Sequence, residues 1–472
     1  MTFRNESDLI GTREIPVDAL WGIHSLRAKE NFSVTGRKPD PQLIHSYGVV
    51  KTACLTAARR CGAWQSRPES ADALLQAAGE VSGGILDDSI IVDALCGGAG
   101  TSLNMNVNEV ITNRALQILG HTPGEYSILS PLDDANRFQS TNDTFPTALR
   151  HAAIALLRSL EQQCVTLQET FIAKEQEFAD IVKIGRTEYQ DAVLTTLGRE
   201  MSAFAEAFGR DRWRIYKCEE RLRTVSLGGT AIGTGIAAPK QYIFPVVDIL
   251  CELSGFGFAR AENLVEATQN TDAFVEVSGI LCALAATLIK CANDLRFLSS
   301  GPHAGIGEIT LPPMQSGSSI MPGKVNPVIP EAVIQNSLLV LGLHGTLTQA
   351  ASSGHLELNP FIPLIADCLL QQIRLLSSAV EMLSSRCIAG ITANRDICRQ
   401  QVENSHAVAT ALLPLLGYEK MSDVIVSASK ENKTVRQYVI EHDLCTSEAF
   451  EMYTSPEAVC RLGTPVNESN KN

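Results

Sequence analysis

Apolar side chains in the middle of the chain recur with alternating spacings of three and four residues. Three stripes of this kind run over residues 157–178, 277–298 and 369–383. This spacing keeps one face of an α-helix on a packing seam, and a helix of about 30 residues spans roughly 45 Å at about 1.5 Å per residue. Two further apolar-periodic stretches, at about 194–223 and 331–351, raise the prediction to five long helices.

These helices predict an all-α fold, with a long central helical bundle and smaller lobes at both ends. We expect an N-terminal lobe over residues 1–140, a central bundle domain over 141–395 and a small helical C-terminal domain over 396–472, with a helical stretch at 396–415. Gly and Pro break the segment LIGTREIPVDALWGIHSLRA near the N-terminus, which indicates a short hairpin. The stripes are long and broad enough to need partners on other chains, so we expect an oligomer.

Composition narrows the class of protein. The 472 residues are 45% apolar and 19% charged, values typical of a globular protein with a large core. The formal net charge of −13, from 39 basic and 52 acidic residues, argues against a general nucleic-acid binder. The 13 cysteines stand singly without a C-x-x-C pair, as expected for reduced thiols in the cytoplasm rather than for disulfides or a zinc site.

The ends of the chain and its hydropathy predict neither export nor insertion into a membrane. The N-terminus, MTFRNESDLIG, is polar and lacks the apolar core of a signal peptide. No uninterrupted apolar run reaches the roughly 18 residues of a membrane span. The last residues, PVNESNKN, are expected to fray.

Four polar, Gly-rich segments interrupt the helical pattern, and chemistry is expected there. Their polar side chains are Thr101, Ser102, Asn104, Asn106 and Asn108 in 98–110; Ser140, Thr141, Asn142 and Asp143 in 137–147; Thr187, Glu188 and Gln190 in 185–192; and Ser318, Ser319, Lys324 and Asn326 in 314–331. Any one cluster taken alone could do no more than cap a helix. Together they supply the hydroxyl, amide and lysine donors that hold a small carboxylated molecule.

Several partial motifs fail on spacing. GSSIMPGKV has five residues rather than four between Gly317 and Gly323, and Val325 replaces the Ser or Thr of a phosphate-binding loop. GGTAIGTGIAAP lacks the G-x-G-x-x-G spacing of a dinucleotide site, and SGSSIM lacks the G-x-S-x-G of a serine hydrolase. The nine histidines form no H-x-x-x-H pair. We therefore expect neither a metal site nor an organic cofactor.

The segment GSSIMPGKVNP resembles the signature of the aspartase/fumarase superfamily, which is long and specific. Segments along nearly the whole chain resemble that superfamily in order and spacing: GTSLNMNVNEVITNRAL, QSTNDTFPTA, GRTEYQDAVLTTLG, LGGTAIGTGI, VEATQNTDAFVEVSG and NDLRFLSSGPHAGIGEI. QSTND rather than QSSND, together with GITAN at 390–394, makes the chain more similar to the aspartate ammonia-lyases than to the fumarases.

This resemblance implies an all-helical subunit in a homotetramer, with a shared central bundle and active sites that combine segments from three subunits. It also implies reversible anti elimination of ammonia, or of an amine, from L-aspartate or a substituted aspartate to give fumarate, without an organic cofactor. Removing a proton from the carbon beside a carboxylate puts a second negative charge on that carboxylate. Donors must therefore surround it before the proton leaves.

The resemblance assigns the binding roles residue by residue. The positions that hold the carboxylate gaining charge are matched by Thr101, Ser140 and Thr141. Those that hold the other carboxylate are matched by Thr187, Lys324 and Asn326. Asn142 matches a position near the leaving amino group.

Ser318 matches the catalytic base, on a mobile Gly-rich loop that closes over the substrate, and Ser319 follows it in the same motif. A serine hydroxyl is a poor base in water. We therefore expect backbone N–H groups and the nearby Lys324 to stabilise its anion.

Several positions depart from the superfamily pattern. Glu188 stands where fumarases and some aspartases have histidine and other aspartases have glutamine. Ala237 replaces the asparagine of GTGxN, His303 the arginine of GPRxG, and DAN at 134–136 the usual HVN. An enzyme with these changes could keep the elimination and accept a different amine or substrate.

Two interpretations of Glu188 remain open. A carboxylate that faces a dicarboxylate is repulsive unless it is protonated or meets a cation. Our hypothesis is that Glu188 pairs with the substrate's ammonium, or with an extra amino group on a larger substrate. Alternatively, it points to solvent or pairs with a nearby base. For the whole chain, the rival functions are a fumarase-type hydratase acting on malate and a catalytically silent homologue.

Overall fold

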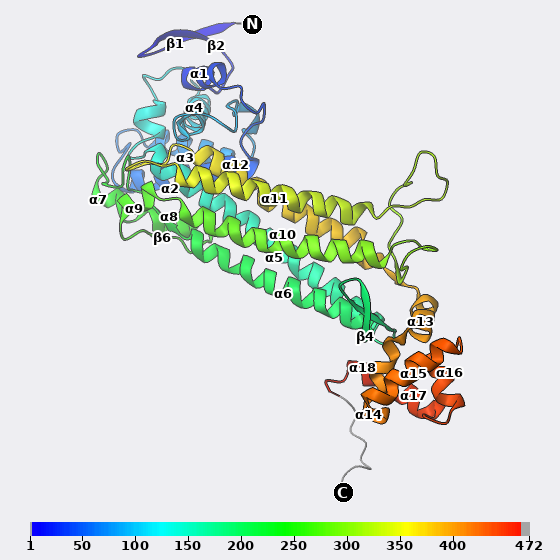
Figure 1. Ribbon diagram of the computed structural model, residues 1–472. Helices are drawn as coiled ribbons and strands as arrows, with labels where there is room; N and C mark the ends of the chain where they lie inside the picture. The colour runs from blue at the N-terminus through cyan, green and yellow to red at the C-terminus, as the bar shows by residue number, and fades with distance from the viewer. Residues whose placement is uncertain (1, 464–472) are drawn as a thin grey trace. The chain divides into compact units, whose positions relative to one another are not determined.

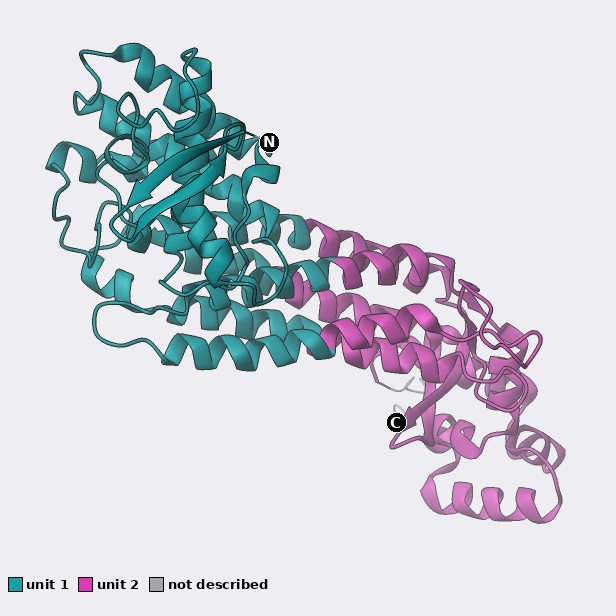
Figure 2. Ribbon diagram, turned by 90° about the horizontal axis from the view of Figure 1, so that it is seen from above, with its two compact units in different colours: residues 1–161, 213–285, 338–377 teal, residues 162–212, 286–337, 378–472 magenta. Residues whose placement is uncertain are grey.

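The computed structural model describes residues 2–463, so the end expected to fray, PVNESNKN, lies outside the described residues. The chain divides into two compact units (Figure 2). Unit 1 comprises Met1–Glu161, Trp213–Ala285 and Leu338–Ser377, and unit 2 comprises Gln162–Arg212, Ala286–Ser337 and Ser378–Asn472.

The five predicted long helices are confirmed (Figure 1). They are α5 (Thr141–Glu177), α6 (Leu197–Leu222), α10 (Asp272–Leu298), α11 (Val328–Ser352) and α12 (Ile362–Arg386). The apolar stripes are their buried faces: Leu160 on α5, Leu281 on α10 and Leu376 on α12 are all fully buried. The all-α class is confirmed as well, because the strands of the described chain form only two-stranded sheets.

Unit 1 holds shorter helices from the N-terminal part of the chain and from the segment between α6 and α10. They are α1 (Ile23–Asn31), α2 (Pro41–Arg60), α3 (Pro68–Ser82), α4 (Thr101–Ile118), α7 (Lys240–Ile243), α8 (Val246–Ser254) and α9 (Leu264–Gln269), with a 3-10 turn at Asp87–Ser89 and a π turn at Pro131–Ala135. Strand β5 (Thr224–Val225) pairs in parallel with β6 (Ala259–Arg260). The expected N-terminal hairpin starts earlier than its segment: β1 (Phe3–Asp8) pairs antiparallel with β2 (Gly11–Pro16).

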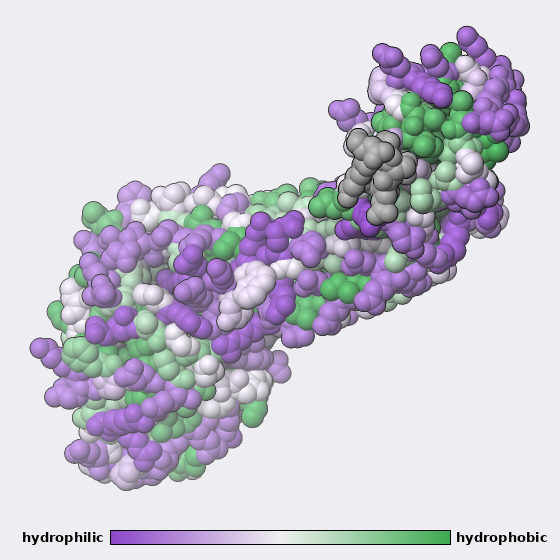
Figure 3. All heavy atoms as spheres, turned by 90° about the horizontal axis from the view of Figure 1, so that it is seen from below, coloured by the Kyte–Doolittle hydropathy of each residue, from purple (hydrophilic) through white to green (hydrophobic). Residues whose placement is uncertain are grey.

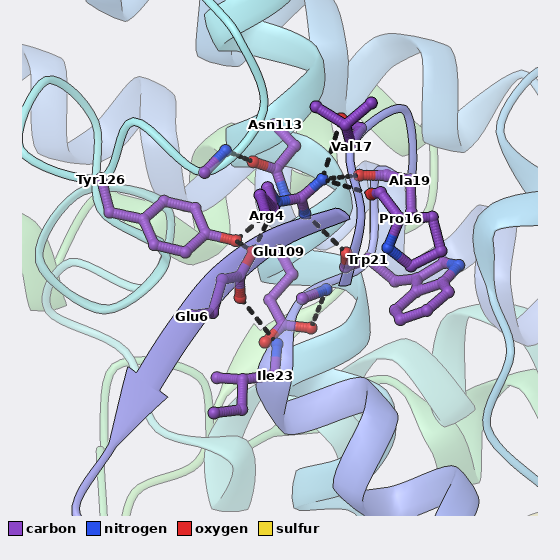
Figure 4. Close-up of polar contacts among 12 residues, drawn as sticks. Arg4, Glu6, Pro16, Val17, Ala19, Trp21, Ile23, Glu109, Asn113 and Tyr126 are labelled. Atoms are coloured by element: carbon purple, nitrogen blue, oxygen red, sulfur yellow. Dashed lines mark hydrogen bonds and ion pairs between the residues drawn. The ribbon is translucent and has the colours of Figure 1, made fainter. Parts of the chain in front are cut away.

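A buried polar cluster fastens this hairpin to α4 (Figure 4). Arg4 donates to the carboxylate of Glu6 at 2.9 Å and to the backbone oxygens of four residues between positions 16 and 21. Glu6 accepts from the backbone N–H of Ile23 at 2.8 Å. Glu109 on α4 accepts from the N–H groups of Gly22 and His24, each at 2.8 Å. Burial raises the pKa of Glu109, and these donors oppose that rise.

Unit 2 holds the C-terminal lobe and two small sheets. Its helices are α13 (Arg395–Asn404), α14 (Leu413–Leu416), α15 (Tyr418–Lys430), α16 (Val435–Glu441), α17 (Ser447–Thr454) and α18 (Pro456–Cys460). The helical stretch expected at 396–415 is broken at Ser405, whose hydroxyl caps a 3-10 segment, His406–Leu412, by accepting from Ala407 N. Strands β7 (Ile309–Thr310) and β8 (Thr392–Ala393) pair antiparallel, and a second 3-10 turn lies at Ile388–Gly390.

The segment GRTEYQDA, expected as a polar loop between helices, is instead the tip of a β-hairpin. Strand β3 (Val182–Thr187) pairs antiparallel with β4 (Gln190–Thr196), and Thr187 lies opposite Gln190. Apolar and polar residues alternate only over Val182, Lys183 and Ile184, which is too short a pattern to be recognised beside two long helical patterns.

Apolar side chains also lie on the surface. Figure 3 shows apolar patches among the polar surface of the face it draws. On α11, Leu338, Leu339 and Leu341 are all exposed. By length and composition alone α10 and α11 could cross a membrane, a test that core helices of soluble proteins also pass.

All 13 cysteines are free thiols, as expected.

Gly48 sets how closely α2 and α3 pack. A Cβ at this position would lie 2.3 Å from the backbone nitrogen of Ser82 and 2.7 Å from its Cα. Backbone atoms cannot move aside cheaply, so only glycine permits this approach.

We predict that Gly48→Ala lowers the free energy of unfolding by about 1–3 kcal/mol, because the new methyl group overpacks the α2–α3 contact. Gly79→Ala on α3 is the matched control. A Cβ there meets no atom within 4 Å, and alanine should raise the free energy of unfolding by about 0.5–1 kcal/mol. Urea unfolding of both variants measures the difference, and equal stabilities would contradict this account of the contact.

Candidate active site

Helix α4 begins at Thr101, directly after three residues with positive φ: Gly98 (84°), Ala99 (55°) and Gly100 (88°). Glycine is required at position 100, because a Cβ would lie 2.3 Å from the ring of Phe145. Gly100 provides no side-chain cap, and Thr101 is exposed. The Thr101 N–H donates to the backbone oxygen of Gly98 at 3.0 Å, and the positive end of the dipole of this 18-residue helix favours an anion here.

Helix α5 begins at Thr141, and the contact between Phe145 and Gly100 makes its start adjoin that of α4. The hydroxyl of Ser140 accepts from the backbone N–H of Asn142 at 3.2 Å, so Ser140 is also a helix cap. The Asn142 amide donates to the backbone oxygen of Ala231 at 2.7 Å. Unit 1 thus brings together Thr101, Ser140, Thr141 and Asn142 at two neighbouring helix starts.

Asp143 holds the start of α5 in place through buried hydrogen bonds. Its fully buried carboxylate accepts three backbone N–H groups, from Ser140 at 3.0 Å, Thr230 at 3.0 Å and Gly228 at 3.2 Å. Burial raises the pKa of Asp143 to about 6, and the three donors oppose that rise. One carboxylate thereby joins the start of α5 to the Gly-rich turn at 228–230.

The loop that carries Ser318 is closed at its base by backbone contacts. Gly317 N donates to the oxygen of Lys324 at 2.9 Å, and the Asn326 amide donates to the oxygen of Gly317 at 2.7 Å. A Cβ on Gly317 would lie 2.6 Å from the oxygen of Lys324. This closure brings the two arms of the motif together just before α11 begins.

The Ser318 hydroxyl accepts from two backbone N–H groups, Ile320 at 3.2 Å and Met321 at 3.0 Å. These are donors of the kind expected around a serine that must carry negative charge. Ser318 is half-buried, whereas Ser319 and Lys324 are exposed.

At the hairpin tip, Glu188 and Tyr189 form a two-residue turn in which both have positive φ, 53° and 63°. Hairpin turns of this type favour Asn and Gly, so a Glu-Tyr pair is strained by roughly 1–3 kcal/mol per residue. The Tyr189 ring packs edge-on against Phe297 with centroids 5.1 Å apart. Thr187 and Glu188 are exposed.

A cavity of about 410 Å³ lies beside this turn. Its charged lining comprises Lys183, Arg186, Glu188, Glu200, Lys290 and Asp294. Glu188 therefore shares a cavity with three basic side chains and two other carboxylates. This setting leaves open both a local ion pair and a role in binding a substrate.

Buried ion pairs hold the β3–β4 hairpin in place. Glu308 is fully buried and pairs with Lys183 at 2.8 Å and with Arg186 at 2.8 Å. Lys183 also pairs with Glu200 at 2.5 Å, and Arg186 donates to Gln401 at 3.0 Å. Burial raises the pKa of Glu200, against the pull of Lys183. Glu308 directly precedes β7, so the same cluster ties the hairpin to the chain that leads into the Ser318 loop.

The candidate site residues thus form two groups, one in each unit. Unit 1 holds Thr101, Ser140, Thr141 and Asn142, and unit 2 holds Thr187, Glu188, Ser318, Ser319, Lys324 and Asn326. The first group offers hydroxyls, an amide and two helix starts, which suit a carboxylate. The second offers a serine with backbone donors, a lysine and amides, which suit a base and a second carboxylate.

Comparisons with known proteins show the family of the chain. Residues 11–342 match the family described as Lyase, and residues 408–461 match the family described as Fumarase C C-terminus. The chain is 44% identical to the aspartate ammonia-lyase of Escherichia coli (strain K12) over 447 residues, covering 94% of this chain and 93% of that protein. The chain belongs to the aspartase/fumarase superfamily.

Other members are similar along almost their whole length. The aspartate ammonia-lyase of Bacillus sp is 41% identical, with 98% of each chain covered. A fumarate lyase:delta crystallin structure from Brucella melitensis, bound to cobalt, has a TM-score of 0.94 at 44% identity, covering 98% of this chain and all of that one. A class II fumarase from Schistosoma mansoni has a TM-score of 0.89 at 32% identity, covering 97% of this chain and 99% of that one. The greater similarity to aspartate ammonia-lyases than to fumarases is confirmed.

One departure from the superfamily pattern has a structural account. Asp134 is buried and accepts from the indole N–H of Trp64 at 2.7 Å and from Arg67 at 2.5 Å, so it has a partner of its own. Ala237 keeps a positive φ of 65°, which the asparagine usual in the superfamily adopts more readily. Nothing in the structure explains His303, which is exposed.

Sequence reasoning gave no role to Asp143 and did not find Glu308. The signal for Asp143 was present, since Ser140 followed three residues later by a carboxylate is the spacing of a helix-capping box. Glu308 carried no local signal, because its partners lie more than 100 positions earlier in the chain.

We predict that Asp143→Asn disrupts the start of α5. An amide has one acceptor oxygen, and its NH₂ group would face a backbone N–H. The free energy of unfolding should fall by about 1–3 kcal/mol, the cost of an unsatisfied buried donor. The KM for aspartate should rise as Ser140 and Thr141 shift. Asp133→Asn, which removes the same charge from an exposed side chain ten positions earlier, is the control. Identical behaviour of the two variants would show that Asp143 does not hold this segment.

Proposed function

We propose that the protein catalyses the reversible anti elimination of ammonia from L-aspartate to give fumarate. The observation that carries the proposal is the Ser318 hydroxyl, held by two backbone N–H groups in a loop closed at its base, in a chain of this superfamily. The superfamily membership supports a carbon–nitrogen lyase. Similarity to several aspartate ammonia-lyases at 41–44% identity supports aspartate, or a substituted aspartate, as the substrate.

In the proposed reaction Ser318, as its alkoxide, takes a proton from the carbon beside one carboxylate. The electron pair left behind spreads into that carboxylate, which then carries two negative charges. This electron pair then forms the carbon–carbon double bond as the C–N bond breaks. The amino group leaves with the electrons of the broken bond. The two N–H groups that hold Ser318 lower the cost of its negative charge.

Thr101, Ser140 and Thr141 are proposed to hold the carboxylate that gains charge. Their hydroxyls lie at the adjoining starts of α4 and α5, where the helix dipoles also favour an anion. Thr187, Lys324 and Asn326 are proposed to hold the other carboxylate, with Ser319 beside them on the loop and Asn142 near the leaving amino group. These donors are positioned before the reaction, so little reorganisation accompanies the transition state.

A homotetramer with active sites shared among three subunits is the proposed assembly. Members of this superfamily are typically oligomeric, and the two groups of site residues belong to different units of the chain. The exposed leucines of α11 supply apolar surface that an interface with further copies would cover. We also propose the domain division 1–140, 141–395 and 396–472 and a cytoplasmic location.

Replacing the base tests the mechanism. Ser318→Ala should lower kcat by about 10²–10⁴-fold, the usual contribution of general base catalysis, while the assembly state in sedimentation stays unchanged. Fumarate is followed by its ultraviolet absorbance. Ser316→Ala, at an exposed serine of the same loop, is the control and should retain wild-type turnover. Substantial activity in Ser318→Ala would remove this residue as the base. Turnover of malate by the wild type, without any turnover of aspartate, would favour the fumarase-type alternative.

Glu188 is proposed to pair with the ammonium of the substrate, or with an extra amino group on a larger one. Glu188→Gln keeps the shape of the side chain and removes its charge. The KM for aspartate should then rise about tenfold, the loss expected for one charge-assisted hydrogen bond, while the inhibition constant of fumarate should hardly change. A panel of amines added to fumarate would reveal a larger natural amine. Equal effects on aspartate and fumarate would contradict the pairing.

A further inference from the structure

Lys51, in the middle of α2, is a fully buried lysine outside the residues assigned to the reaction. Its ammonium donates to two side-chain amide oxygens, Gln139 Oε1 at 2.8 Å and Asn136 Oδ1 at 3.2 Å. Burial lowers the pKa of Lys51 to about 8. Two titratable neighbours, Cys54 and Asp143, oppose this shift. A buried ammonium held by neutral oxygens is costly, so its retention calls for a specific use.

Asn136 is the centre of the cluster around Lys51. Its Oδ1 also accepts from Asn104 at 3.2 Å and from Asn108 at 3.0 Å, both on α4. Its own amide donates to the backbone oxygen of Gln139 at 3.2 Å. Side chains of both α2 and α4 therefore donate hydrogen bonds to the same short turn, residues 136–140.

The turn held in this way ends at Ser140, which is proposed with Thr101 and Thr141 to hold the substrate carboxylate that gains charge. Gln139, which accepts from Lys51, is directly bonded to Ser140. The backbone oxygen of Ser140 accepts from the Thr144 hydroxyl at 2.8 Å, and that hydroxyl also contacts Asn104 at 3.4 Å. A continuous set of short contacts thus runs from the Lys51 ammonium to the backbone on both sides of the Ser140 hydroxyl.

We propose that Lys51 is a positioning residue, which locks the turn at 136–140 so that Ser140 and Thr141 meet the substrate carboxylate at the correct distance. This inference rests on the proposed function. Lys51 does not touch the substrate. It acts through Gln139 and Asn136, and displacing a binding group by about 1 Å can cost as much as about 100-fold in rate.

Lys51→Met tests the proposal, because methionine keeps most of the buried stem and removes the ammonium. We expect the KM for aspartate and the inhibition constant of fumarate to rise together by about tenfold or more, since both ligands carry the carboxylate. Lys51→Gln, which retains a donor, should lie between Lys51→Met and the wild type. It also serves if the methionine variant does not fold.

Ser46→Ala is the matched control. Ser46 lies on α2, is fully buried and donates or accepts one hydrogen bond, with His151 at 2.8 Å. This variant loses a buried polar contact of the same helix without touching the turn at 136–140. Its melting temperature should fall at least as far as that of Lys51→Met, while its KM stays at the wild-type value. Equal rises in KM for the two variants would overturn the proposal, because general loosening of α2 would then suffice.

A double-mutant cycle with Ser140→Ala separates this inference from the proposed function. If Lys51 acts through Ser140, the two substitutions together should raise KM little more than the larger single effect. Independent, multiplying effects would overturn the role of Lys51 while leaving Ser140 assigned. An unchanged KM in Ser140→Ala alone would instead refute the proposed carboxylate site, and the role of Lys51 with it.

Discussion

The buried apolar seams along the five long helices are the constraint on which both groups of site residues depend. A helix that must keep one face in the core cannot carry its polar chemistry along that face. The chemistry therefore lies where helices begin or are interrupted. Thr101 and Ser140 stand at the starts of α4 and α5, and the Ser318 motif ends directly before α11. At these points the positive ends of the helix dipoles favour anions, and hydroxyl and amide side chains lie beside the first backbone N–H groups.

Buried charges then give these helix ends a defined geometry. The carboxylate of Asp143 holds three backbone N–H groups, Glu308 pairs with two basic side chains beneath the hairpin, and Lys51 grips two amides. Such groups contribute little net stability, because desolvation offsets most of their attraction. Their effect is to make one backbone arrangement far better than its neighbours. A reaction that places two negative charges on one carboxylate needs that kind of rigidity.

The sequence predicted the long helices better than the hairpin and the buried charged groups that hold the site residues. Apolar side chains at spacings of three and four are a local signal, and all five long helices were predicted from it. The β3–β4 hairpin was missed because apolar and polar residues alternate only over Val182, Lys183 and Ile184, and Lys183 is itself buried. The ten candidate site residues all lie in the four polar segments, but the polar pattern alone could not separate binding groups from helix caps, and most of their roles came from the resemblance. Ser140 shows why, since its hydroxyl does cap α5.

Glu188 combines a strained backbone with a side chain that lies among other charged groups. Its backbone is held at positive φ in a turn that rests on Phe297 through Tyr189, so the side chain starts from a fixed place. The basic residues that share its cavity already have partners: Lys183 and Arg186 pair with Glu308, and Lys290 pairs with Asp294. A further carboxylate in such a setting gains most from a cation that the protein does not supply. Aspartate carries such a cation and malate does not, which is the reason for proposing that Glu188 pairs with the ammonium of the substrate.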